Sequence, residues 1–191
     1  MILIINTMKT NLETSKSVKL VTQLKLVFTF FAYLILVSSS KACDCTGGPH
    51  CLQRLTNVAT SSSGTTVYSG NGITSNDFII IEGDFYVNNN CSFVGANIKL
   101  SCDARIIIQY GGSLTIDNCW LHSCDNIHMW DQITDAGGAN NLTIKNGSAI
   151  EDAKFGLNIS NVEYDIRDSH FNKNYISIRL NNINQTTGTI R

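Results

Sequence analysis

The sequence predicts an all-β fold in which short strands stack into successive coils, forming a solenoid. From about residue 78 onward, short β-branched runs alternate with clusters of Asn, Gly, Asp and Ser, and no segment shows sustained helical periodicity. Four five-residue segments can also be superimposed, with starts 29, 28 and 22 residues apart. The 191 residues include 21 asparagines and 23 isoleucines, residue types that favour turns and strands respectively.

The first 42 residues are expected to be a secretory signal peptide. Four lysines precede an uncharged apolar run at residues 26–37, and three serines, Lys41 and Ala42 follow it. A basic region, a 12-residue apolar region and a small residue at a cleavable junction are typical of export, and the run is short for a membrane span. We therefore expect a secreted or cell-surface protein without a transmembrane helix after cleavage. Lipid attachment at Cys43 is an alternative that stays open.

Charge and cysteine content indicate which functional class and which cellular compartment the protein belongs to. After Ala42 the chain holds 9 lysines and arginines against 14 aspartates and glutamates. A mildly acidic chain lacks the basic surface that binds phosphates, which excludes a nucleic-acid-binding protein of that type. All seven cysteines follow Ala42, as expected in an oxidising compartment. Cys91 and Cys119 lie six and five residues after the starts of adjacent repeats, so they are candidates for a disulfide.

Residues 43–77 differ from the rest and are expected to form a lead-in or cap before the stack. Residues 60–75 are rich in Ser, Thr and Gly. In the preceding segment, Leu52, Leu55 and Val58 have a near-helical spacing. That spacing fits a short capping helix as well as a strand.

Residues 78–191 carry the repeats, whose aligned segments begin at Phe85, Leu114, Leu142 and Tyr164. In each segment the first and third positions are apolar, the alternation expected of a strand with one face in the core. The fifth position is Asn or Asp, which tolerate a left-handed backbone and suit a turn. Stacked in register, these fifth residues would form a polar ladder of Asn89, Asn118, Asn146 and Asp168.

A second inward-facing set is expected seven or eight residues after each start, at Phe93, Leu121, Ile150 and Phe171. Apolar runs at 98–100, 105–109, 155–159 and 175–180 would supply the remaining sides, giving about three strands per repeat. One such coil cannot bury its apolar face alone, so stacking is expected to build one continuous core.

Three segments, at 111–124 (GGSLTIDNCWLHSC), 142–157 (LTIKNGSAIEDAKFGL) and 168–180 (DSHFNKNYISIRL), resemble the repeats of large secreted bacterial surface proteins with the pectate-lyase-like fold. This resemblance covers roughly residues 78–183 and implies a right-handed parallel β-helix of about four recognisable coils. It selects no activity, because the fold hosts lyases, hydrolases, adhesins and passive stalks. Family members commonly have more coils. We therefore expect the N-terminal part of a longer protein, with end-to-end self-association through an open edge.

The candidate catalytic residues are Asp117, Lys145 and Arg167. They take the fourth position of successive repeats, so they should line up on one outer face about 5 Å apart per coil. A carboxylate beside two cations could hold and cleave an acidic sugar, as in a polysaccharide lyase or glycoside hydrolase. The simpler interpretation is an exposed cross-strand ion pair contributing roughly 0.2–1 kcal/mol, and the frequency of solvated charges on strands favours it.

Trp120 and Trp130 are the candidate ligand-binding residues. Exposed aromatic side chains mark interaction sites and can stack on sugar rings, although core packing is an open alternative. We therefore expect a structural, adhesive or glycan-binding module without its own catalysis, with a polysaccharide or a cell-surface molecule as partner. The competing class is a carbohydrate-active enzyme.

We expect no cofactor and no metal site. Calcium is the one ion that the acidic residues suggest as an alternative. The adjacent Glu151 and Asp152 supply too few oxygens for this ion. Asp125, Asp131 and Asp135 with loop carbonyls could supply more. Solvated loop carboxylates are the favoured interpretation.

Overall fold

The computed structural model describes residues 45–125, 127–138, 140–182 and 187–191. They belong to the second of two compact units, Met1–Ala42 and Cys43–Arg191. The expected signal peptide and lipid attachment at Cys43 therefore lie outside the described residues. Within the described ranges the secondary structure consists of strands, turns and bends, with no helix. Accordingly, these ranges contain no helix with the length and hydropathy of a membrane span.

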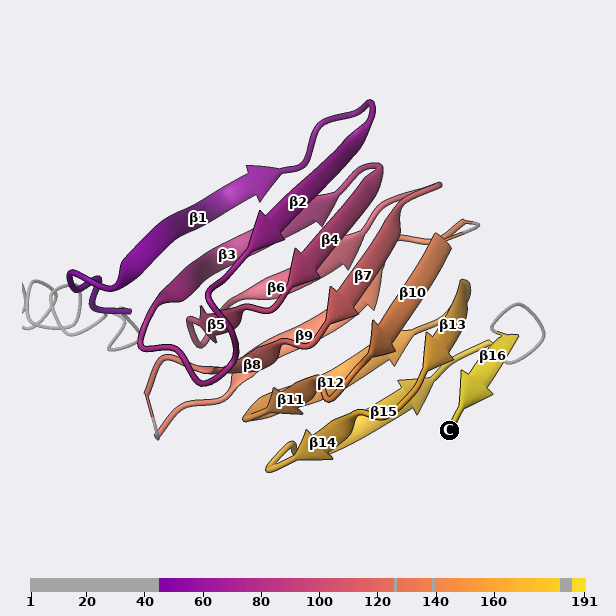
Figure 1. The fold of residues 1–191 in the computed structure, drawn as a ribbon. Coiled ribbons are helices and arrows are strands. Elements are labelled where there is room, and N and C mark those ends of the chain that lie inside the picture. Colours follow the sequence, from indigo (N-terminus) through magenta and orange to yellow (C-terminus); the bar gives the residue numbers. More distant parts are fainter. Residues whose placement is uncertain (1–44, 126, 139, 183–186) are drawn as a thin grey trace, which may run out of the picture. The chain divides into compact units, whose positions relative to one another are not determined.

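The described residues form sixteen strands in two parallel sheets (Figure 1). The strands are β1 (Cys51–Ala59), β2 (Thr65–Ser69), β3 (Phe78–Val87), β4 (Asn90–Val94), β5 (Asn97–Leu100), β6 (Arg105–Ile108), β7 (Ser113–Asp117), β8 (Trp120–Ser123), β9 (Trp130–Asp135), β10 (Asn140–Lys145), β11 (Ala149–Glu151), β12 (Ala153–Ile159), β13 (Val162–Ile166), β14 (His170–Asn172), β15 (Ile176–Leu180) and β16 (Thr187–Ile190). The ten-stranded first sheet has the order β14-β11-β8-β5-β3-β6-β9-β12-β15, with β1 paired to β3. The six-stranded second sheet has the order β16-β13-β10-β7-β4-β2.

Each coil of the chain passes through the first sheet and then through the second. The long strand β3 pairs with β5 through its first half and with β6 through its second half. From β5 onward, each coil therefore contributes two short strands to the first sheet and one to the second. The result is a parallel β-solenoid of about six coils, which confirms the expected fold class. The coil number exceeds the expected four for two reasons. The strands β1 and β2 already form a coil within the segment expected to be a lead-in, and β16 continues the second sheet beyond the last aligned repeat.

Three of the four aligned repeats lie in the predicted register. Leu114, Leu142 and Tyr164 are neighbours in the second sheet. The fourth alignment is wrong: Phe85 lies in the first sheet opposite Ile106. Cys91 and Phe93 take the places expected for Phe85 and Val87, because β4 rather than β3 pairs with β7.

The turn that follows the second sheet repeats from coil to coil. Asn118, Asn146 and Asp168 all have a left-handed backbone, with φ of 50°, 58° and 46°. The corresponding residue of the preceding coil is Gly95, with φ of 57°. Asn89 lies before β4 instead, where its side-chain amide donates to the Ser62 carbonyl at 3.4 Å.

The second inward set is also displaced at its first member. Leu121, Ile150 and Phe171 are register neighbours in the first sheet, as expected. On the preceding coil, the register neighbour of Leu121 is Ile98 and not Phe93. Phe93 instead packs in the core, with ring centroids 5.2 Å from Tyr68 and 5.5 Å from Phe85.

One continuous core fills the space between the sheets. Its inward residues are fully buried on every central coil, for example Ile98, Ile106, Leu114, Leu121 and Ile144. Burial of one such side chain contributes roughly 1.5–3 kcal/mol. The stack therefore gains stability from each added coil, as expected of a solenoid.

A smaller apolar cluster lies on the outer side of the first sheet. Phe78 and Ile80 point outward from β3, yet they are buried and pack with Cys45. A disulfide joins Cys45 to Cys124, with 5.3 Å between the Cα atoms and a sequence separation of 79. The segment before β1 is thus tied to the loop after β8. Of the two structures that the spacing allowed for residues 52–58, the strand is the one formed.

Candidate functional site

A groove of about 500 Å³ lies beside Trp120 on the outer side of the first sheet. We call it the Trp120 groove; its lining residues are Ile73, Thr74, Trp120, Gly147, Ala149, Glu151 and His170. Trp120 and Ala149 are register neighbours on β8 and β11. On the following coil, His170 of β14 is the register neighbour of Ala149. The next coil carries only the methyl group of Ala149 at the position of the Trp120 indole. It therefore leaves space beside the Trp120 ring.

Small residues keep this space open. Gly147 precedes β11 with φ of 79°, and a Cβ atom at this position would meet no other atom within 4 Å. The other wall comes from Ile73 and Thr74, in the connection between β2 and β3. The Trp120 groove therefore combines segments of several coils.

The indole of Trp120 is held in one orientation by two contacts. Its ring stacks on the His122 ring, with centroids 4.0 Å apart and planes inclined by 22°. Its Nε1 donates to Glu151 Oε2 at 3.2 Å. Trp120 is partly buried, so part of its ring remains accessible from the groove. A fixed, partly exposed indole is an apolar platform of the kind on which ligand rings stack.

His122 is a partly buried, neutral support of this platform. Its Nε2 lies 2.9 Å from Asn97 Oδ1, within hydrogen-bonding distance. Burial lowers the pKa of His122 to about 4. The imidazole is therefore uncharged near neutral pH.

Glu151 connects the groove to the core. Besides accepting from Trp120, its carboxylate accepts from Asn172 Nδ2 at 3.3 Å and lies 3.6 Å from Lys173 Nζ. Its backbone oxygen accepts from Trp130 Nε1 at 2.6 Å. This role of Glu151 is not visible in the sequence, because the spacing along the chain does not reveal contacts between coils.

Trp130 does not take the ligand-binding place expected for it. It is fully buried in the core, where it is a register neighbour of Ala153. The long loop between β8 and β9 obscures the alternation of inward and outward residues in the sequence. Trp130 is therefore a core residue, whose indole N–H is satisfied by the Glu151 carbonyl.

The candidate catalytic residues lie on the outer side of the second sheet. Asp117 and Lys145 are register neighbours, with Oδ2 and Nζ 3.3 Å apart. The other Asp117 oxygen accepts from Asn146 Nδ2 at 2.7 Å. Arg167 turns toward its own strand and pairs with Asp165 at 2.9 Å. The three residues thus share a face but form two separate ion pairs.

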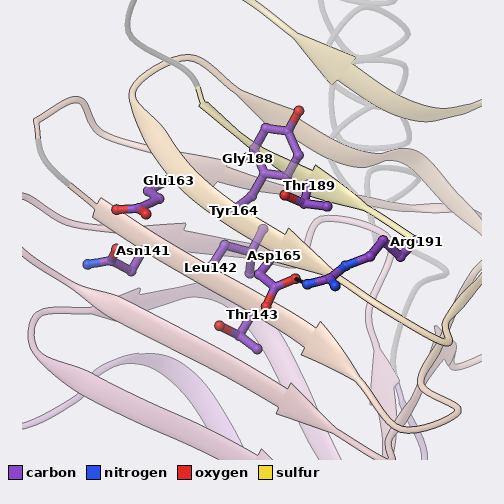
Figure 2. Close-up of a pocket in the computed structure, with 9 residues that line it drawn as sticks. All are labelled: Asn141, Leu142, Thr143, Glu163, Tyr164, Asp165, Gly188, Thr189 and Arg191. Atoms are coloured by element: carbon purple, nitrogen blue, oxygen red, sulfur yellow. Dashed lines mark ion pairs between the residues drawn. The ribbon is translucent and has the colours of Figure 1, made fainter.

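A second, smaller pocket of about 300 Å³ lies on the same sheet, over β10, β13 and β16 (Figure 2). It is lined by Asn141, Leu142, Thr143, Glu163, Tyr164, Asp165, Gly188, Thr189 and Arg191. Figure 2 shows the Asp165 carboxylate directed toward Arg191, 3.9 Å from its guanidinium. The charged side chains at this end of the pocket, Asp165 and Arg191, are therefore paired with each other.

The loop carboxylates considered for calcium have partners within the protein. Asp125 accepts from the Ile127 and His128 backbone and lies 3.0 Å from His128 Nδ1. Asp135 accepts from the Ser160 backbone at 2.7 Å. Over the described ranges, three or more acidic, His or Cys side chains do not gather in a metal-binding arrangement.

The expected bridge between Cys91 and Cys119 is not formed. Both thiols are free and buried. Cys91 stacks on Leu114 at the start of its strand, whereas Cys119 follows the turn at the end of the next strand, so they occupy different positions along the coil. Burial raises the pKa of Cys91 to about 12 and that of Cys119 to about 11. Cys102 is disulfide-bonded.

No protein-family model, curated protein or solved structure matches this chain. The β-solenoid assignment therefore stands on strand order and register alone.

Proposed function

We propose that this chain is an exported β-solenoid module that binds a glycan through the Trp120 groove and has no catalysis of its own. A structural or adhesive role at a cell surface is part of the proposal. So is kinship with the pectate-lyase-like surface β-helices, which the stacked parallel coils support. The observation that carries it is the oriented indole of Trp120 above the space left by Gly147 and Ala149.

The lining chemistry of the groove fits a sugar ring. Its apolar contacts come from Ile73, Trp120 and Ala149, and its polar groups from Glu151 and His170. A sugar presents an apolar C–H face to an indole and hydroxyls to carboxylate and imidazole groups. Ligand sites typically combine an apolar lining with a few oriented polar groups.

The ion pairs on the second sheet favour a binding module over an enzyme. A lyase or hydrolase acting through Asp117 and Lys145 would need these groups to face substrate. Instead, the two side chains contact each other, and Arg167 contacts Asp165. This pairing is the expected state of solvated charges on a strand face.

Glycan binding by Trp120→Ala tests the proposal. A panel of immobilised neutral and acidic polysaccharides would be titrated with the wild-type protein and the variant, with Tyr175→Ala as the control. Tyr175 is an aromatic residue with 77% of its surface exposed, outside the groove. We expect saturable wild-type binding, at least a tenfold weaker affinity for Trp120→Ala, and no change for Tyr175→Ala. Equal affinity of wild type and Trp120→Ala would refute the role of the groove.

A further inference from the structure

The sequence contains five Asn-x-Ser/Thr motifs, the acceptor pattern for N-linked glycosylation. Four lie within the described ranges, at Asn90, Asn141, Asn146 and Asn158; the fifth, at Asn184, lies outside them. The motif alone does not distinguish among them in an Asn-rich chain. Their surroundings in the fold do, because an attached glycan needs an exposed amide that the fold does not already use.

Asn141 meets this condition. It is exposed on the outer side of the second sheet, with Ser113 and Glu163 as its register neighbours. Thr143 lies two residues further along β10, so its hydroxyl is on the same face as the Asn141 amide. Figure 2 shows Asn141 at one end of the second-sheet pocket, away from the Asp165–Arg191 ion pair.

Asn158 differs because both of its amide atoms are used within a ladder of side chains. Its Nδ2 donates to Gln132 Oε1 at 2.8 Å. Its Oδ1 accepts from Asn181 Nδ2 at 2.8 Å. Asn158 is also partly buried. A sugar on its Nδ2 would displace side chains that join three successive coils.

Asn146 is also engaged by the fold. Its Nδ2 donates to Asp117, and Ser148, which completes its motif, is fully buried. Asn90 is exposed at the start of β4, but the central residue of its motif is the buried Cys91. Of the four described sequons, Asn141 thus meets both conditions, because its side chain is exposed and its amide is not engaged by the fold.

We infer that Asn141 is an N-glycosylation acceptor, modified by a transferase of the secretory pathway that uses a lipid-diphosphate-linked oligosaccharide. In this step the Asn141 amide nitrogen bonds to the anomeric carbon of the first sugar. The bond from that carbon to the diphosphate breaks, the lipid diphosphate leaves, and the amide gives up one proton. The attached glycan would project from the second sheet, whereas the Trp120 groove lies on the first. The inference requires export but not the proposed glycan binding.

Site occupancy in the secreted protein tests this inference. The full chain would be expressed in insect cells, released from its glycans by a peptide N-glycosidase in H₂¹⁸O, and mapped by peptide mass spectrometry. We expect Asn141 to carry the isotope label in more than half of the molecules and Asn158 to remain unlabelled. An unlabelled Asn141, or equal labelling of Asn158, would overturn the inference, as would failure of the chain to be secreted.

A matched pair of variants separates modification from folding. Thr143→Ala removes the acceptor motif, whereas Thr115→Ala changes the register neighbour of Thr143 on β7 and leaves every motif intact. We expect Thr143→Ala to lose the label at Asn141 completely and Thr115→Ala to retain it. Retention of the label in Thr143→Ala would contradict the assignment.

Discussion

The Nε1 atom of Trp120 donates a hydrogen bond across one coil to the carboxylate of Glu151, at 3.2 Å. This bond links an outward aromatic residue of β8 to an outward acidic residue of β11. Since the Glu151 backbone also accepts from the buried Trp130, the same residue connects the groove with the core. The orientation of the proposed binding platform thus depends on a contact between residues 31 positions apart.

Glu151→Ala is expected to destabilise the protein by about 1–3 kcal/mol, because it leaves the indole N–H of Trp120 without its partner and removes the contacts to Asn172 and Lys173. The free energy of unfolding in urea measures this loss. Glu163→Ala is the control, since Glu163 is exposed on the second sheet and its removal should change stability by at most about 0.5 kcal/mol. Equal losses in the two variants would argue against a supporting role for Glu151.

Acidification should destabilise the wild-type protein through His122. Burial lowers the pKa of His122 to about 4 in the folded state, against roughly 6.5 in an unfolded chain. Between these values the unfolded state binds the proton and the folded state does not, so stability falls as the pH falls. From pH 7.5 to pH 5, His122 alone should cost on the order of 2 kcal/mol.

His122→Gln provides the comparison, because glutamine does not titrate. The free energy of unfolding of each protein would be measured at both pH values, so that carboxylates common to both proteins cancel. We expect the wild-type protein to lose more stability than the variant on acidification. Parallel losses would mean that His122 titrates normally in the folded state.

The thiols of Cys91 and Cys119 should resist alkylation in the native protein. Both are buried, and burial raises the pKa of Cys91 to about 12 and that of Cys119 to about 11, so little thiolate forms at pH 8. Mass spectrometry after iodoacetamide treatment should find both sites unmodified in buffer and modified in guanidinium. Cys51, which is free and partly exposed, serves as the internal reference. Alkylation of Cys91 or Cys119 as fast as Cys51 in the native protein would contradict the burial.

Removal of the Cys45–Cys124 disulfide should lower the free energy of unfolding by about 2–5 kcal/mol, because the bridge closes a long loop in the unfolded chain. The double variant Cys45→Ser/Cys124→Ser measures this loss by thermal and urea denaturation. Cys51→Ser is the matched control, since it changes a neighbouring cysteine that is not in a disulfide. A loss of the same size in Cys51→Ser would show that packing, rather than the bridge, is responsible.

Sequence reasoning identified the central coils because their strands alternate strictly and end in the same left-handed turn. It failed at Phe85, since Phe85 and Val87 alternate in the same way as Cys91 and Phe93, and alternation does not say which sheet a strand joins. The first coil was missed because β1 is one long strand rather than two short ones.

The candidate site was predictable only in part. Trp120 was identified as an exposed aromatic residue of one coil, and the structure places it in a groove. The wall formed by Ile73 and Thr74 could not be found, because the connection between β2 and β3 carries no repeat. Trp130 was misassigned because a loop between β8 and β9 interrupts the pattern of inward and outward residues.

The central claim is that the Trp120 groove holds a glycan without cleaving it. Incubating the wild-type protein with each polysaccharide of the panel, and measuring bound glycan and released reducing or unsaturated ends in the same sample, tests this claim most directly. The account predicts saturable binding with no released ends above the protein-free control. Product release that is abolished by Asp117→Ala or Lys145→Ala would contradict it and would assign the chain to the carbohydrate-active enzymes.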